Sequence, residues 1–284
     1  MQGHQSFADE LTRLAAELPD PRVAVIAARV AAPLRVAVCG RRGVGRRTVA
    51  AALRGAGVAV STRPGAEMVA DMVADMVGDV VAYVVAEVAK PEDTAAVAAL
   101  DKPVLVVLNK ADLPGGAGPA EVSALVGASA EPMAGLLAVA AFTGFGGPFG
   151  GRLDGTAEQA RALLRRLSGV DTVVGRLVAL GAAVRYRRIS EAVAELDALA
   201  VGAARIGEFL ADDAVVAARM AAAVAVVEAA GLSAGLTGNP DAELRRAARW
   251  QHYSAAPVTA LHRACGADIA RGSLRIWSRT GEPE

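Results

Sequence analysis

The pattern of apolar and polar residues changes twice along the chain. Up to about residue 32 the apolar positions, such as Leu11 and Leu14, have helical spacing. Short apolar runs then alternate with helical stretches, and further along strand signals nearly vanish. The sequence therefore predicts a helical lead-in over residues 1–32, an α/β domain over residues 33–150 and an all-α helical domain over residues 151–284.

The middle part consists of short apolar runs separated by short helical stretches. The runs predict strands at 34–39, 58–62, 80–86, 104–108 and 136–141, and helices are expected at 48–53, 66–77, 94–100 and 121–126. This alternation is typical of a parallel sheet with helices on both faces. Unbroken apolar strands are typical of a sheet that is covered on both sides.

A glycine-rich segment over residues 142–155, which also holds Pro148, marks the predicted domain boundary. Beyond it, helical periodicity predicts helices at 157–167, 172–180, 189–200, 214–230, 241–253 and 258–270. Expected helix starts are Asp212, Asp241 and Ser254, and expected ends are Gly181, Gly202 and Gly231.

The composition of the chain argues against some classes of function and location. The 284 residues carry 30 basic and 30 acidic side chains, and this balance argues against a nucleic-acid binder. The two cysteines do not form a disulfide framework, and the chain opens without a secretory signal, so we expect a cytoplasmic location. No stretch of about 18 uncharged apolar residues occurs, so integral membrane insertion is not expected, whereas peripheral contact stays open.

The first motif lies between a predicted strand and a predicted helix and reads Gly-Arg-Arg-Gly-Val-Gly-Arg-Arg-Thr. A phosphate-binding loop has the pattern Gly-x-x-x-x-Gly-Lys-Ser/Thr in that setting. Its backbone N–H groups curl around phosphate oxygens, glycine tolerates the positive φ angles, and the next helix adds its positive end. The predicted phosphate contacts are Gly40, Arg41, Arg42, Gly43, Val44, Gly45, Arg46, Arg47 and Thr48.

The second motif, Asn109-Lys-Ala-Asp112, directly follows the apolar run 104–108. The Asp112 carboxylate can accept two hydrogen bonds from N1 and N2 of guanine. Asn109 can contact the base edge, and the stem of Lys110 can cover the ring. In an alternative reading the motif only caps a turn, since Asn and Asp do so readily.

Together the two motifs resemble those of the P-loop GTPases of the translation-factor-related class, the Era-like group. That family's loop reads Gly-Arg-x-x-Val-Gly-Lys-Ser-Thr-Leu, and its base-reading motif falls on Asn109, Lys110 and Asp112. A further family motif is a Ser-Ala pair whose backbone touches the guanine carbonyl, and it falls on Ala140 and Ala141. The resemblance implies a P-loop NTPase-like fold over residues 34–147 with GTP or GDP as ligand.

The phosphate-loop motif departs from the family's pattern at two positions. The family's lysine aligns with Arg46, whose planar guanidinium cannot replace a point charge in the same pocket. The magnesium-binding Ser/Thr of the family aligns with Arg47, which has no acceptor for a cation. We therefore assign no metal ligand and do not expect magnesium.

Two more departures follow the loop. The family's Asp-x-x-Gly aligns with residues 62–65, where Thr62 replaces the aspartate, and residues 75–78 are the alternative. The short connection from Leu53 to Val58 leaves no room for the first switch loop and its edge strand, so five parallel strands are expected.

These losses predict weak or absent GTP hydrolysis, because phosphoryl transfer needs a bridging metal and a residue that positions water. No catalytic residue is assigned. The leading reading is a degenerate, guanine-nucleotide-binding GTPase that regulates a protein partner, and the resemblance suggests an intact GTPase as that partner. Two alternatives stay open. One is a nucleotide-free scaffold whose loop arginines pair with its own acids, and the other is a GTPase active only with catalytic groups from a partner.

Overall fold

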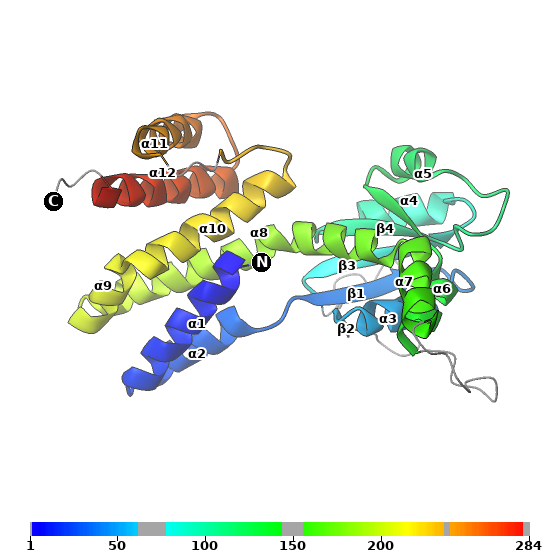
Figure 1. Ribbon diagram of the computed structural model, residues 1–284, viewed down its shortest axis with the longest axis horizontal. Helices are drawn as coiled ribbons and strands as arrows, with labels where there is room; N and C mark the ends of the chain where they lie inside the picture. The colour runs from blue at the N-terminus through cyan, green and yellow to red at the C-terminus, as the bar shows by residue number, and fades with distance from the viewer. Residues whose placement is uncertain (1, 62–77, 144–155, 236–238, 281–284) are drawn as a thin grey trace. The chain divides into compact units, whose positions relative to one another are not determined.

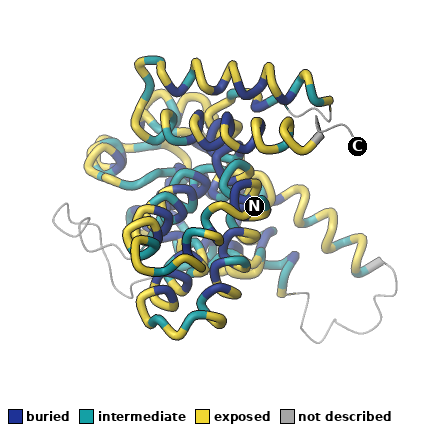
Figure 2. Tube along the Cα trace, turned by 90° about the vertical axis from the view of Figure 1, so that its left-hand side faces the viewer, coloured by how far each residue is buried: buried dark blue, intermediate teal, exposed yellow. Residues whose placement is uncertain are grey.

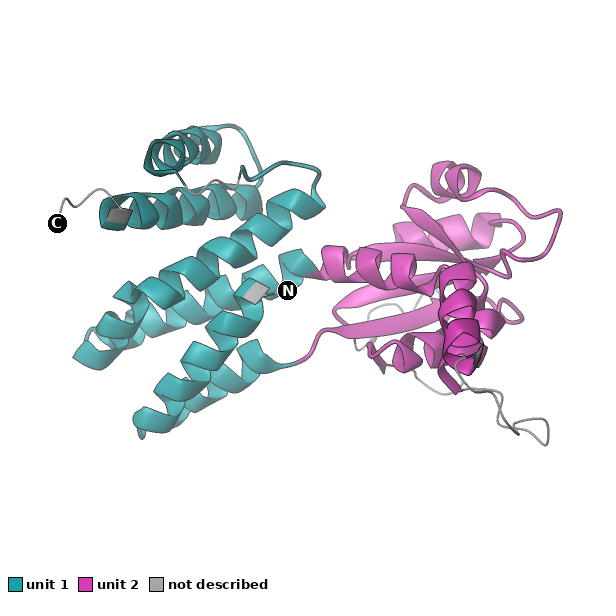
Figure 3. Ribbon diagram, viewed as in Figure 1, with its two compact units in different colours: residues 1–32, 182–284 teal, residues 33–181 magenta. Residues whose placement is uncertain are grey.

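The computed structural model describes residues 2–61, 78–143, 156–235 and 239–280 (Figure 1). It divides into two compact units, which are coloured separately in Figure 3. Unit 1 comprises residues 1–32 and 182–284, and unit 2 comprises residues 33–181. The sequence placed the boundary at residue 150, whereas residues 156–181 pack with the sheet. The predicted lead-in joins the C-terminal helices.

A five-stranded parallel sheet forms the centre of unit 2. Its strands are β1 (Arg35–Gly40), β2 (Ala59–Ser61), β3 (Val80–Ala86), β4 (Val104–Asn109) and β5 (Ala130–Met133), in the order β2-β1-β3-β4-β5. Ala86 pairs with Asn109, and Asn109 pairs with Met133, so these carboxyl ends meet at one edge. The predicted parallel sheet flanked by helices is confirmed.

Helices cover both faces of this sheet (Figure 1). The helices of unit 2 are α3 (Arg46–Gly55), α4 (Pro91–Ala98), α5 (Pro119–Val126), α6 (Gly135–Thr143), α7 (Thr156–Ser168) and the first part of α8 (Val170–Ala200). One apolar core joins the sheet to α3, α6 and α8 through Leu53, Ala138 and Val173. A second core joins it to α4 and α5 through Val97 and Val122. The strands are therefore buried on both sides, as their unbroken apolar runs predicted.

The last strand differs from the prediction. The segment 136–141 was expected to be a strand, but it lies in α6, and the last strand is β5. Leucine and alanine dominate this segment, and both are strong helix formers. Strand β5 was not predicted, because it contains Pro132. A proline is tolerated in an edge strand, and β5 pairs only with β4 among the described strands. The helix expected at 66–77 lies outside the described residues.

Unit 1 is built from helices. They are α1 (Gln2–Glu17), α2 (Pro21–Ala31), the second part of α8, α9 (Ala204–Ala211), α10 (Asp213–Ala229), α11 (Pro240–Ala255) and α12 (Ala260–Thr280). Their buried faces, dark blue in Figure 2, form one core. Its large members include Phe7, Tyr186 and Trp250. Asp212 caps α10 as predicted, whereas Asn239, not Asp241, caps α11.

The helices predicted at 172–180 and 189–200 are one continuous helix, α8. Gly181 was expected to end the first of them, but it lies inside α8 and is buried. No proline interrupts the intervening residues, so nothing local forces the helix to stop. Helix α9 was missed by the sequence analysis.

No single helix among the described residues is long and apolar enough to span a membrane. Helices α7 and α8, bent by 57° at their junction, satisfy length and composition only as a pair. The α8 part of this pair supplies Val170, Val173 and Leu177 to the sheet core, where each is at most 1% exposed.

A buried polar network links α8, α10 and α12. The Asp268 carboxylate accepts hydrogen bonds from the Tyr186 hydroxyl at 2.7 Å and from the Arg219 guanidinium at 2.7 Å. Burial, together with the neighbouring Asp268 charge, raises the pKa of the Tyr186 hydroxyl, so it remains a neutral donor. The network supplies partners for polar groups that the helical core would otherwise leave unsatisfied.

Replacing Asp268 by alanine should destabilise unit 1 strongly. Arg219 would keep a buried charge without its acid partner, and such a loss costs about 3–5 kcal/mol. Urea unfolding followed by circular dichroism measures this change. The exposed Asp197 of α8 is the matched control, and Asp197→Ala should change the unfolding free energy by no more than about 0.5 kcal/mol. Equal effects of the two variants would contradict the structural role of the network.

Candidate functional site

The loop between β1 and α3 turns tightly at the carboxyl edge of the sheet. Gly40, Gly43 and Gly45 have φ angles of 135°, 84° and 90°. A Cβ atom on Gly40 would lie 2.2 Å from the Val84 carbonyl oxygen of β3, and one on Gly45 would lie 2.2 Å from Nδ2 of Asn109. Backbone conformation and close packing therefore both require glycine at the two ends of the predicted phosphate loop.

Asn109 connects this loop to the rest of the edge. It is the last residue of β4 and is 4% exposed. Its Nδ2 donates to the Val44 carbonyl oxygen at 2.8 Å, and its Oδ1 accepts from the Gly135 amide at 3.0 Å. One side chain thus fixes the loop after β1, the end of β4 and the start of α6. The sequence analysis predicted that Asn109 contacts the edge of a base, and the structure shows that its amide also pairs with the backbone of two other segments.

The chain turns sharply directly after Asn109. Lys110 has a φ of 61°, and the Leu113 amide donates to the Lys110 carbonyl oxygen at 3.0 Å. Among the described residues, Glu87 and Lys110 are the two non-glycine residues with positive φ, and they follow the carboxyl ends of β3 and β4. Such conformations are strained and cluster at functional sites. The turn leaves Asp112 exposed at this edge.

Ala140 and Ala141 do not lie where the family resemblance placed them. Both are inside α6 rather than in a loop after a strand, and Ala141 is buried. The turn that follows the last strand contains Ala134 and Gly135 instead, and the Gly135 amide is the one that faces Asn109. This correction follows from the misplaced last strand.

Arg41 of the loop is paired with Asp93 of α4, a partner that the sequence analysis missed. Arg41 Nε donates to both carboxylate oxygens, at 2.8 and 2.9 Å. The fully buried Asp93 also accepts from the Tyr83 hydroxyl at 2.9 Å and from the Lys90 amide at 2.9 Å. The hydrogen bond to Asp93 raises the pKa of Arg41. The position of Asp93 in the first turn of a helix was the available signal, since acids there cap the backbone.

The other loop arginines lie near the start of α3. Arg42 and Arg47 are exposed, and Arg46 is partly buried. Burial raises the pKa of the nearby Cys39 thiol to about 12, although the Arg46 charge acts in the opposite direction, so the thiol stays protonated. The Thr48 methyl group is directed toward Gly135, since a Cβ atom there would lie 3.3 Å from it. No group of three potential metal-ligating side chains gathers among the described residues.

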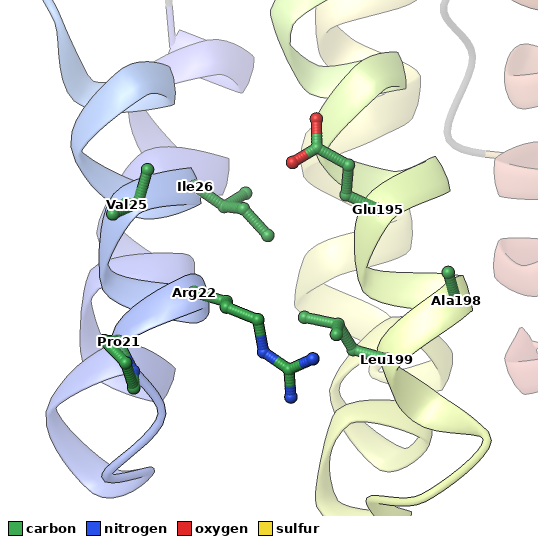
Figure 4. Close-up of a pocket in the computed structure, with 7 residues that line it drawn as sticks. All are labelled: Pro21, Arg22, Val25, Ile26, Glu195, Ala198 and Leu199. Carbon is green, nitrogen blue, oxygen red and sulfur yellow. The ribbon is translucent and has the colours of Figure 1, made fainter.

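A cleft of about 460 Å³ lies elsewhere, in unit 1 between α2 and α8 (Figure 4). Figure 4 shows Arg22, Ile26 and Leu199 directed into the space between these helices. None of the predicted site residues lines this cleft.

Comparison with protein-family models, with curated protein sequences and with solved structures finds no match.

Replacing Asn109 by alanine should destabilise the carboxyl edge of the sheet. The variant leaves the Val44 carbonyl and the Gly135 amide without their partner, which should cost about 2–3 kcal/mol of unfolding free energy. The matched control is Asn239→Ala, which removes one exposed helix cap at a cost of about 1 kcal/mol. Chemical unfolding compares the two. An effect of Asn109→Ala no larger than the control would show that the amide does not hold the edge together.

Proposed function

We propose that this chain is a degenerate P-loop GTPase. It binds GTP or GDP at the carboxyl edge of the unit 2 sheet and hydrolyses GTP slowly or not at all. The bound state regulates contact with a protein partner. The observation that carries this proposal is the Asn109 side chain, which holds the glycine-rich loop beside the turn that exposes Asp112.

The start of α3 supports phosphate binding. Gly45 occupies the N-cap position of α3 and offers no side-chain cap. The first amides of a helix have no acceptor within the helix itself. Together with the helix dipole these amides favour an anion. Arg46 and Arg47 add positive charge in the same turn.

The turn after β4 supports selection of guanine. Guanine presents two adjacent donors, N1–H and the N2 amino group, and an ionised carboxylate is an acceptor-only group with two oxygens. Asp112 is exposed at this edge, and Lys110 stands two residues before it. Adenine has an acceptor at N1, so the same carboxylate would disfavour it.

Slow hydrolysis follows from the side chains beside the loop. Arg47 stands where the resemblance expects a magnesium-binding hydroxyl, and a guanidinium repels a cation. Without a bridging metal, the developing charge on the β- and γ-phosphate oxygens lacks its usual stabilisation. The arginines can still act as phosphate counter-charges, so binding without turnover is expected.

A nucleotide-free scaffold is the second candidate, and the Arg41–Asp93 pair favours it. This pair neutralises one loop arginine within the protein itself, as the scaffold reading requires. The two candidates differ in whether any nucleotide binds. A GTPase completed by a partner differs from both, because it would turn over GTP when that partner is added.

Thermal unfolding with GTP, GDP or ATP, with and without magnesium, separates these functions. Saturation at about a hundred times the dissociation constant stabilises a protein by about 2.7 kcal/mol, which raises the midpoint by about 2–8 °C. We expect this rise with guanine nucleotides only, independent of magnesium. A magnesium-dependent rise would overturn the metal-free site. The absence of a rise with every nucleotide would favour the scaffold.

Asp112→Asn should change base preference from guanine to xanthine. The amide offers one donor and one acceptor, which match the C2 carbonyl and N1–H of xanthine. We expect GDP affinity to fall by about tenfold or more and xanthosine diphosphate affinity to rise, as measured by calorimetry. Asp101→Asn is the control, because this exposed residue precedes β4 at the opposite edge of the sheet. Unchanged base preference in Asp112→Asn would show that the base site is misassigned.

A further inference from the structure

The helices on the two faces of the unit 2 sheet differ in charge. On one side, α3 carries three arginines and no acid, and α6 carries no charge. Helix α7 carries three arginines and one glutamate, and its Arg165 is paired with Asp171 of α8 at 2.8 Å. On the other side, α4 and α5 carry no basic residue and expose Glu92 and Glu121, whereas the third acid, Asp93, is buried and paired with Arg41. We call the layer formed by α3, α6 and α7 the basic face. The sheet unit is therefore electrostatically polarised although the whole chain has no net charge.

Large aliphatic side chains are exposed on the basic face. Leu136 of α6 is 75% exposed, and Leu163 and Leu167 of α7 are 44% and 61% exposed. Leu163 and Leu167 are four residues apart, so they lie one above the other on the helix surface. Arg166 is exposed beside them. The acidic side also exposes Leu125 of α5, but no basic residue of α4 or α5 accompanies it.

Helix α7 forms an outer layer against α6. The Ala134 amide donates to the Ser168 carbonyl oxygen at 2.9 Å, which brings the end of α7 to the start of α6. The Arg165 guanidinium lies 5.5 Å from the centre of the Phe142 ring of α6. These contacts fix α7 against α6.

We propose that the basic face docks on a membrane surface rich in anionic lipid. Helices that lie in a membrane interface combine exposed leucine with arginine in this way, and arginine is attracted to anionic headgroups. Leucine offers neither hydrogen bonds nor stacking to nucleic acid, and it is under-represented among the energetic anchors of protein interfaces. The α8 partner of the bent α7–α8 pair is committed to the sheet core, so α7 lies on the membrane rather than crossing it.

Vesicle flotation tests this surface directly and does not depend on nucleotide binding. The full chain is mixed with vesicles of phosphatidylcholine alone, or with about one third phosphatidylglycerol. We expect flotation only with the anionic vesicles, weakening as salt is raised. A failure to float with either vesicle overturns the proposal. Equal binding to duplex DNA would point to a general polyanion site and would also overturn it.

Paired variants locate the contact. Leu163→Ser/Leu167→Ser and Arg161→Gln/Arg166→Gln should each lower the partition coefficient by about tenfold or more. Leu125→Ser is the control for the leucines, and Arg245→Gln/Arg271→Gln, two exposed arginines of unit 1, is the control for charge. All variants change exposed residues, and their thermal unfolding should match the unmodified protein. Controls that lose binding as strongly as the basic-face variants would overturn the proposal.

Discussion

The carboxyl edge of the sheet depends on one buried amide. Asn109 accepts from the backbone after β5 and donates to the backbone of the loop after β1, across the end of its own strand β4. A buried amide is costly unless both of its ends are paired. The loop after β1 and the start of α6 must therefore stay where they can pair with the Asn109 amide. This constraint also sets the spacing of the exposed groups at the carboxyl edge.

The sequence predicted the features that depend on backbone rules. Gly40 and Gly45 were placed at the ends of a tight loop because their spacing and setting require positive φ, and the structure has both in that region. The apolar runs of β1, β3 and β4 were placed because strands covered on both faces must be apolar throughout. Local chemistry is sufficient for such elements.

The sequence did not predict the features that depend on tertiary contacts. Residues 136–141 are apolar at every position, so periodicity could not separate a strand from a helix. The Arg41–Asp93 pair joins residues separated by 52 positions, and the first-turn position of Asp93 does not indicate which residue pairs with it. The same limit applies to Asn109. Its position after a strand was evident, but its two backbone partners became known only from the packing of three segments.

Helix α8 contributes to the apolar cores of both units. Its first turns complete the sheet core through Val170, Val173 and Leu177, and its later turns enter the helical core through Tyr186 and Ile189. The border between the units therefore falls within a helix, where backbone carbonyl oxygens accept hydrogen bonds from amides of the next turn. A fragment cut at the glycine-rich segment would lose part of the sheet core. Dissecting this protein into independently folding pieces requires both pieces to retain their own share of α8.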